Sequence, residues 1–424
     1  MNIHGGVGLV EMTRRGFMLR AGVGTSALLL GGCKTPLISE PRLLNPCATV
    51  LPPELAGHPL VMSAWEGLRP ERVWDAHVHL AGIGDTDSGI EVSRRMMSPV
   101  FPAQYVQRLF YMNAGCVHKS DDFIDPSYVA RIQNLMKYMP EGFKVMLFAL
   151  DRTYGLDGAA RSSDTALYVP NSYTRDVAQS MSDRAEWVCS IHPYREDALE
   201  ALAQAKQEGA KAVKWLPPAM GINPSSPRCD AFYDALLSHN LPLITHVGEE
   251  MAVVGAGRPI WGNPLMLRRA LDKGVKVIMA HCASMGEDTD LDQGEDGPRV
   301  ESFSLFRRLM NERHYEGLLF GDISAIAQRN REFEVIAELL EQEAWHDRLL
   351  FGSDYPLPGV LPLTSPVLLA RAGLLDPDAV QTITELRRYN PILFDFVLKR
   401  HLHSRGKGFG KQVFETRRVF DSAL

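Results

Sequence analysis

Short apolar runs that end in polar residues alternate with amphipathic segments along most of the chain. The apolar runs have the length of strands, and the segments between them place apolar residues three or four positions apart, which is the spacing of helices. The predicted strands span residues 75–79, 143–151, 186–192, 211–215, 241–246, 275–281, 317–322 and 349–354. The clearest helical segments span residues 197–208, 230–239, 264–273, 302–313 and 331–343.

Eight strands in alternation with helices predict an α/β fold, specifically a (β/α)₈ barrel of the TIM type. A doubly wound sheet is the competing architecture, but it normally carries a glycine-rich turn after its first strand, and none follows residues 75–79. The long connection 80–140 and the acidic stretch 287–296 are predicted to be insertions at the barrel rim. The barrel is expected over residues 71–396, followed by a C-terminal tail over 397–424.

The N-terminal residues have the pattern of a targeting segment rather than of a barrel. Arg14 and Arg15 precede a weakly polar stretch that is too short to span a bilayer, so residues 1–33 are interpreted as an export signal. The arginine pair resembles a twin-arginine signal, and Leu30 to Cys33 resemble a lipoprotein box that places a lipid on Cys33. An ordinary secretory signal with an accidental arginine pair is the alternative. We expect an exported protein, periplasmic or anchored on the extracytoplasmic side of the membrane, with the proline-rich residues 34–70 as a tether.

Composition narrows the function classes. The 424 residues are 45% hydrophobic and 23% charged, with a formal net charge of −6, so the chain can bury a large core. The mild negative charge and the lack of long basic runs argue against nucleic acid as a partner and favour a small-molecule substrate. Five cysteines follow Cys33 without any Cys-x-x-Cys pair, so no disulfide framework is evident and buried free thiols are predicted.

The polar residues at the strand ends are the candidate chemistry. Side chains alternate between the faces of a strand, so Asp75, His77 and His79 share one face. Such a pair of histidines alone fits a surface site equally well, but barrel enzymes place their chemistry at the C-terminal strand ends. The residues expected there are His77, His79, His246, His281 and Asp354. Neutral imidazoles with one carboxylate suit zinc or a similar divalent ion that keeps an open position for water.

Five motifs follow one another along the chain: Asp75-Ala-His77-Val-His79, Thr245-His246, Ala280-His281, Gly352-Ser353-Asp354-Tyr355-Pro356 and Asn390-Pro-Ile-Leu-Phe394. In this strand order they resemble the metal-dependent amidohydrolase superfamily, specifically the amidohydrolase-related (amidohydrolase-2) group that also contains decarboxylases. The resemblance implies that His77, His79, His246 and Asp354 hold the metal. It also implies that Asp354 serves as general base and acid for the metal's water, while His281 polarises the substrate oxygen.

Three further residues have two interpretations each. Asp75 either orients a ligand imidazole or makes a buried polar contact below the site. Lys214 stands at the end of the fourth strand, where binuclear relatives carry a carbamylated lysine that bridges two metals, whereas an unmodified lysine would attract a substrate carboxylate. We favour one metal ion, zinc. His192 either lines the pocket or is a hydrogen-bonded structural histidine.

Three functions from different classes remain at this point. The leading hypothesis is a metal-dependent hydrolase that cleaves an amide, ester or lactone with metal-activated water. The second is a metal-dependent decarboxylase of a small carboxylated substrate, which would use much the same ligands. The third is a lipid-anchored binding protein on an inherited barrel without catalysis, and the complete set of candidate ligands argues against it.

Overall fold

Eight parallel strands form the centre of the fold, one in each apolar run that the sequence predicts. The computed structural model describes residues 44–117, 122–253 and 257–421, so the predicted export signal and Cys33 lie outside the described residues. The strands are β1 (Trp74–His79), β3 (Lys144–Phe148), β5 (Ala185–Val188), β6 (Val213–Trp215), β7 (Leu243–Thr245), β8 (Val277–Met279), β11 (Leu319–Asp322) and β12 (Leu349–Leu350).

These strands form a closed ring. Parallel pairing gives two sheets, with the strand orders β1-β3-β5 and β12-β11-β8-β7-β6. At one junction the Ala76 N–H donates to the Phe351 carbonyl at 3.0 Å, and at the other the Lys214 N–H donates to the Cys189 carbonyl at 2.7 Å. Backbone hydrogen bonds therefore join both edges of the two sheets, and the predicted (β/α)₈ barrel is confirmed.

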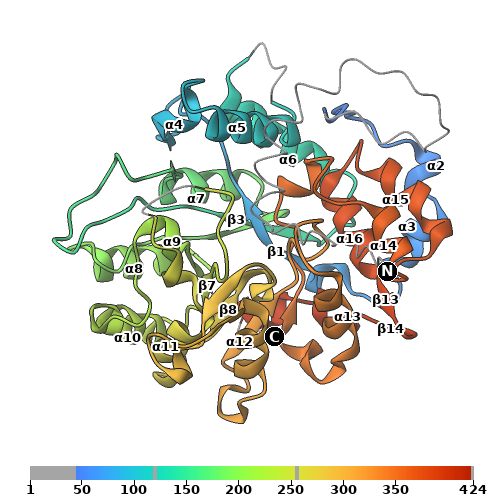
Figure 1. Ribbon diagram of the computed structural model, residues 1–424. Coiled ribbons are helices and arrows are strands. Elements are labelled where there is room, and N and C mark those ends of the chain that lie inside the picture. The colour runs from blue at the N-terminus through green and yellow to red at the C-terminus, as the bar shows by residue number, and fades with distance from the viewer. Residues whose placement is uncertain (1–43, 118–121, 254–256, 422–424) are drawn as a thin grey trace, which may run out of the picture. The chain divides into compact units, whose positions relative to one another are not determined.

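Helices surround the ring, as the ribbon in Figure 1 shows for α8, α10, α11 and α12. Five helices lie within the predicted helical segments: α8 (Ala198–Gln207), α10 (Asp230–Ser238), α11 (Arg268–Asp272), α12 (Ser302–Met310) and α13 (Phe333–Glu341). Others on the chain are α7 (Asn171–Ser180), α9 (Pro217–Met220), α14 (Pro366–Arg371), α15 (Val380–Leu386) and α16 (Pro391–His401). Each long helix turns an apolar stripe towards the strands, which is the burial that the three- and four-residue spacing predicts.

The C-terminal residues are folded onto the barrel rather than forming a loose tail. They form β13 (His403–Ser404), β14 (Lys407–Gly408), α17 (Lys411–Phe414) and α18 (Arg417–Phe420). The Thr416 hydroxyl donates to the carbonyl of Trp74, the first residue of β1, at 2.5 Å. Val419 and Phe420 pack with the barrel-interior side chains. The described C-terminal residues therefore cover the end of the barrel at which the strands begin.

The described part of the expected tether is also folded. It contains α2 (Pro53–Ala56), α3 (Pro59–Ser63) and the 3₁₀ helix η1 (Pro70–Arg72), and Leu51 and Val61 are buried in the core. Cys47 forms a disulfide with Cys116, so the prediction of free thiols is wrong for this pair. The two cysteines are 69 positions apart and no local motif links them. Cys189, Cys229 and Cys282 are buried free thiols, as predicted.

The two predicted insertions lie at the rim of the barrel, at the C-terminal ends of the strands. The first contains β2 (Glu91–Val92), α4 (Arg94–Met97), α5 (Pro102–Ala114) and α6 (Ile124–Met136), and β2 pairs with β4 (Leu167–Tyr168). The acidic stretch forms a hairpin of β9 (Glu287–Thr289) and β10 (Arg299–Glu301), where the Asp290 carboxylate accepts two hydrogen bonds from Arg308 at 2.7 Å. Among the described helices, none combines the length and the apolar character needed to cross a bilayer.

Candidate active site

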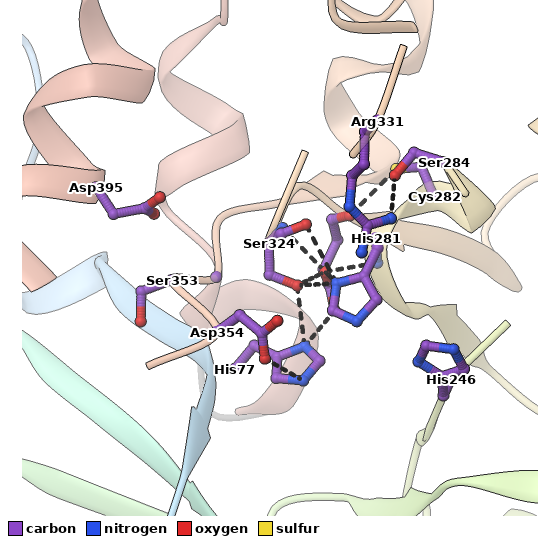
Figure 2. Close-up of polar contacts among 12 residues, drawn as sticks. His77, His246, His281, Cys282, Ser284, Ser324, Arg331, Ser353, Asp354 and Asp395 are labelled. Carbon is purple, nitrogen blue, oxygen red and sulfur yellow. Dashed lines mark hydrogen bonds and ion pairs between the residues drawn. The ribbon is translucent and has the colours of Figure 1, made fainter. Parts of the chain in front are cut away.

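The five residues that the sequence places at the strand ends surround one end of the barrel. His77 and His79 lie on β1, and His246, His281 and Asp354 follow β7, β8 and β12 respectively. Figure 2 shows Asp354 against His77, with His281 above them and His246 on the opposite side. The structure therefore brings these residues to the same mouth, as the strand-end argument predicts.

His77, His79 and Asp354 form the tightest group. The Nε2 atoms of His77 and His79 are 3.2 Å apart. The Oδ1 atom of Asp354 lies 3.2 Å from His79 Nε2 and 3.5 Å from His77 Nε2. One ligand atom from each residue lies within 4.8 Å of the others, a spacing from which the three can hold one metal ion.

Gly352, two positions before Asp354, permits the close approach of the segment after β12 to β1. A Cβ atom at Gly352 would lie 2.7 Å from the Cβ atom of His77, which is closer than real Cβ atoms approach. Any larger residue at position 352 would push the segment that carries Asp354 away from β1. Glycine at position 352 therefore has a steric role, whereas Asp354 two positions later has the chemical one.

His246 stands apart from that group of three but is suited to join it through a metal. Its side chain is buried, and its Nδ1 atom lies 3.3 Å from Glu250 Oε2. Its Nε2 atom is buried without a hydrogen-bond partner among the described residues. A buried ring nitrogen without a partner is costly, and a metal ion would satisfy it. Glu250, four positions after His246, fixes the ring from its other nitrogen.

Asp322 fixes the ring of His77 from behind. Its Oδ2 atom lies 2.9 Å from His77 Nδ1, so the ring proton lies on Nδ1 and the Nε2 lone pair faces His79 and Asp354. Burial, together with the nearby charge of Lys214, lowers the pKa of His77 to about 4. The imidazole is therefore neutral at pH 7, which is the state that binds a metal. The sequence offered one signal for Asp322, because it is the acid that ends the seventh predicted strand.

His281 and Asp354 share an unusual backbone conformation. Their φ angles are 58° and 62°, in the left-handed region that non-glycine residues seldom adopt. Such strain is concentrated at functional sites, where the surrounding structure maintains it. Here Asp322 Oδ1 accepts the His281 backbone N–H at 2.9 Å, and the Ser324 hydroxyl lies 2.8 Å from His281 Nδ1. Asp322 at the end of β11 thus holds the backbone of His281, and Ser324 just after this strand holds its ring.

The charge states of these two side chains suit their predicted roles. Burial holds the pKa of His281 well below its ordinary value, so its ring is neutral at pH 7. Burial alone would raise the pKa of Asp354, but His77, His281 and His79 together hold it well below its ordinary value. Asp354 is therefore ionised, and its carboxylate can bind a metal and accept a proton.

Asp75 lies below the site and contacts the main chain. Its Oδ1 atom accepts the Ser353 N–H at 2.8 Å and the His77 N–H at 3.2 Å, while its Oδ2 atom is buried without a partner among the described residues. Burial raises its pKa to about 7. Asp75 thus links the backbone of β1 to the segment that carries Asp354, whereas Asp322 is the carboxylate that contacts Nδ1 of the His77 ring.

Lys214 and His192 occupy different surroundings. The Lys214 ammonium is buried, and its Nζ atom lies 3.2 Å from His77 Nε2, so it belongs to the cluster. Burial lowers the pKa of Lys214 to about 8. His192 uses both ring nitrogens elsewhere, because Nε2 is 3.0 Å from the Met220 carbonyl and Nδ1 accepts the Tyr194 N–H at 3.1 Å. The structure therefore gives His192 a hydrogen-bonded structural position.

The sequence interpretation missed Arg331 as well as Asp322, Ser324 and Glu250. Arg331 follows β11 and is buried, and its Nη1 atom donates a hydrogen bond to Ser284 Oγ at 2.6 Å. No motif marks it, because the apolar spacing predicts a helix from position 331, whereas the helix begins at Phe333.

The rim insertion reaches the segment that carries Glu250. Gln107 on α5 donates from Nε2 to the Met251 carbonyl at 2.6 Å, and the Tyr111 hydroxyl donates to the Ala252 carbonyl at 2.8 Å. These bonds connect the insertion to the residues after β7, so α5 forms part of the wall around the site.

A match to a protein family agrees with this geometry. The sequence matches the model of the amidohydrolase family over residues 74–385. No curated protein matches the chain. Among solved structures, an uncharacterized TIM-barrel protein, Bb4693 from Bordetella bronchiseptica, is 14% identical with a TM-score of 0.45, covering 77% of this chain and 99% of that chain.

Two further solved structures have assigned reactions. The 5-carboxyvanillate decarboxylase LigW from Sphingomonas paucimobilis is 12% identical with a TM-score of 0.39, covering 82% of this chain and 98% of that chain. The N-isopropylammelide isopropylaminohydrolase from Burkholderia multivorans is 14% identical with a TM-score of 0.39, covering 79% of this chain and 85% of that chain.

Proposed function

Because the chain belongs to the amidohydrolase family, we propose that it is a metal-dependent hydrolase that cleaves an amide, ester or lactone bond of a small molecule. The convergence of His77, His79 and Asp354 within one ligand-atom group is the observation that carries the proposal. The chain is an enzyme, which sets aside the non-catalytic binding protein.

The side chains present fit a divalent metal ion. His77, His79 and Asp354 offer a neutral nitrogen pair and an ionised carboxylate, and the Nε2 atom of His246 is buried without a partner among the described residues. We assign these four residues as the ligands of one ion and propose zinc, which favours nitrogen ligands with a carboxylate and an open position. When bound, such an ion lowers the pKa of water and polarises a substrate oxygen.

The remaining catalytic roles would fall to side chains of the protein. Asp354 takes a proton from the attacking water and returns it to the leaving group, because its carboxylate is ionised and lies at the cluster. His281 donates a hydrogen bond to the substrate oxygen while Ser324 holds the opposite nitrogen of its ring. The Lys214 ammonium adds a positive charge beside His77.

A single ion is consistent with the partners of His77. Its Nδ1 atom is engaged by Asp322 at 2.9 Å, so only Nε2 is directed at the cluster. A second metal ion bridged by a carbamylated Lys214 is the alternative, since Lys214 Nζ lies 3.2 Å from His77 Nε2. Metal content of the wild type and of Lys214→Ala separates the two, because only a binuclear site would lose an ion with the lysine.

A metal-dependent decarboxylase is the second candidate function. The observation that favours it is the pair of buried cations at the site, Lys214 and Arg331, which would attract a carboxylated substrate. A screen of lactones, amides, esters and carboxylated aromatics, with detection of released CO₂, tests both functions. Hydrolysis without CO₂ supports the hydrolase, CO₂ release supports the decarboxylase, and turnover that persists without any bound metal contradicts both.

We also propose that the enzyme is exported through a twin-arginine signal and lipidated at Cys33. Support comes from the Arg14-Arg15 pair, from the lipoprotein-type sequence ending in Cys33, and from the Cys47–Cys116 disulfide, since disulfides persist mainly in oxidising compartments. Cys33→Ala is expected to leave the protein unlipidated and to release it from the membrane fraction. Wild-type protein recovered from the cytosol with residues 1–33 intact would contradict the proposal.

A further inference from the structure

We propose that Arg331 binds a carboxylate group of the substrate, so that the enzyme acts on an anionic small molecule. The inference rests on the proposed metal-dependent function and deepens it by naming the substrate class. It applies to hydrolysis of an acidic amide, ester or lactone and to decarboxylation alike.

Arg331 is largely buried and has more hydrogen-bond donors than its partners use. The residue is 9% exposed and approaches the site from the segment between β11 and α13. One nitrogen, Nη1, donates to Ser284 Oγ at 2.6 Å. Nε is buried without an acceptor among the described residues. A buried guanidinium with an unused donor loses free energy that an incoming acceptor would restore.

Arg331 also lies close to the residue that we assign to the substrate. Figure 2 shows the Arg331 guanidinium beside His281 and Ser284, on the same side of the site as the ring of His281. His281 is the residue that we assign to the substrate oxygen. A substrate whose reacting carbonyl faces His281 would thus present its neighbouring groups to Arg331.

The carboxylates that face Arg331 are engaged by other residues. Three of them, Asp354, Asp322 and Glu250, act on its charge. Each of these side chains is engaged by another histidine: Asp354 by His79, Asp322 by His77 and Glu250 by His246. Within the described part of the chain, Arg331 forms no salt bridge with any of them. Its charge is therefore available to a ligand.

A bound divalent ion would leave the site with an excess of positive charge. Three carboxylates, those of Asp322, Asp354 and Glu250, would then be opposed by Lys214, Arg331 and a doubly charged ion. Positive charge exceeds negative charge by one among these groups, and the partly ionised Asp75 below the site offsets only part of it, so an anionic substrate completes the balance. A guanidinium suits this role because it binds a carboxylate through two parallel hydrogen bonds.

Arg331 also keeps its charge where it lies. Burial lowers its pKa to about 10, opposed by the carboxylates that surround it, so the guanidinium remains protonated at neutral pH. A lysine at this position would keep a charge but would lose the planar pair of donors.

The test compares a carboxylate probe with a neutral one of the same shape. Binding of benzoate and of benzamide to the metal-loaded protein is measured by calorimetry for the wild type, Arg331→Gln, Arg331→Lys and Arg348→Gln. Arg348 is the control, because it is partly buried, donates to the Met310 carbonyl at 2.8 Å and lies at the start of β12, away from the site.

We expect a loss of binding that is selective for benzoate. Arg331→Gln should weaken benzoate binding by roughly 10–100-fold, as for loss of a charge-assisted hydrogen bond, and leave benzamide binding almost unchanged. Arg331→Lys should give an intermediate loss, and Arg348→Gln should match the wild type. If Arg331→Gln does not fold, the same selectivity in Arg331→Lys supports the proposal.

Two results would contradict the proposal that Arg331 binds a carboxylate group of the substrate. Equal loss of both probes, or no loss of benzoate, would make Arg331 a structural residue. Metal content of each variant, measured alongside, separates this failure from failure of the proposed function. Wild-type protein that binds no metal contradicts the metal-dependent function, whereas selective loss of benzoate binding in metal-free Arg331→Gln would still support the anion site.

Discussion

The Nδ1 atom of His77 lies 2.9 Å from the Oδ2 atom of Asp322, which joins the first strand of the barrel to the seventh. This contact fixes the side of the His77 ring that carries the proton, and therefore the side that faces the cluster. In the site that we propose, the orientation of the His77 ring thus depends on Asp322, which contacts the ring nitrogen directed away from His79 and Asp354.

Asp322→Asn is expected to weaken metal affinity by roughly 10–100-fold, because the amide no longer enforces the Nδ1–H tautomer of His77. Competition with a chromophoric chelator measures the affinity. Asp151→Asn is the matched control, since Asp151 is a buried aspartate that follows β3 and accepts hydrogen bonds from the His192 N–H and from Arg195. Equal affinities in the wild type and Asp322→Asn would show that the contact has no role in metal binding.

Asp354→Asn is expected to separate metal binding from turnover. The amide keeps an oxygen that can bind the metal but loses the basicity of the carboxylate, so turnover should fall by roughly 10²–10⁴-fold while metal remains. His281→Ala should also retain the metal, since we assign this ring to the substrate oxygen. Elemental analysis beside turnover checks both variants, and full activity in Asp354→Asn would rule out its role as general base.

The Cys47–Cys116 disulfide is expected to stabilise the enzyme substantially. It closes a segment of 69 positions, and chain entropy alone then contributes about 4 kcal/mol to the free energy of unfolding. Urea unfolding of Cys47→Ser/Cys116→Ser should show this loss, and reductant should lower the wild-type midpoint but not that of the variant. Complete alkylation of both cysteines in unreduced native protein would contradict the disulfide.

The stability of the metal-free protein should depend on pH through Asp395, beside the buried Lys399. Burial raises the pKa of Asp395 to about 6 from its ordinary 3.8, although Lys399 opposes the shift. The folded protein therefore holds this proton more tightly than the unfolded chain does, and the associated stability is lost as pH rises from about 4 through 6.

Asp395→Asn removes that titration, so its free energy of unfolding relative to the wild type should rise across the same pH range. Urea unfolding between pH 4 and 7 measures the difference. Asp183→Asn serves as the control, since the Asp183 side chain is 83% exposed. A difference between the wild type and Asp395→Asn that does not change with pH would contradict the assignment.

The barrel was predictable because each of its strands is a buried apolar run, and buried runs are the strongest signal that a sequence carries. The strand-end rule then located His77, His79 and Asp354 without knowledge of the packing. The sequence could not supply Asp322 as the partner of His77, because that contact joins residues 245 positions apart. Nor could it show that Phe420 packs in the barrel interior, since the short helices near the C-terminus have too few turns to display a periodicity.

We propose that His77, His79, His246 and Asp354 hold one metal ion, and the metal-to-protein ratio reports both the number of ions and their ligands. Elemental analysis should give a ratio near one for the wild type and near zero for His77→Ala/His79→Ala, with the variant still folded because the barrel core is untouched. Lys214→Ala should keep a ratio near one. A wild-type ratio near two that falls with Lys214→Ala, or full metal occupancy in His77→Ala/His79→Ala, would contradict a single ion held by these four residues.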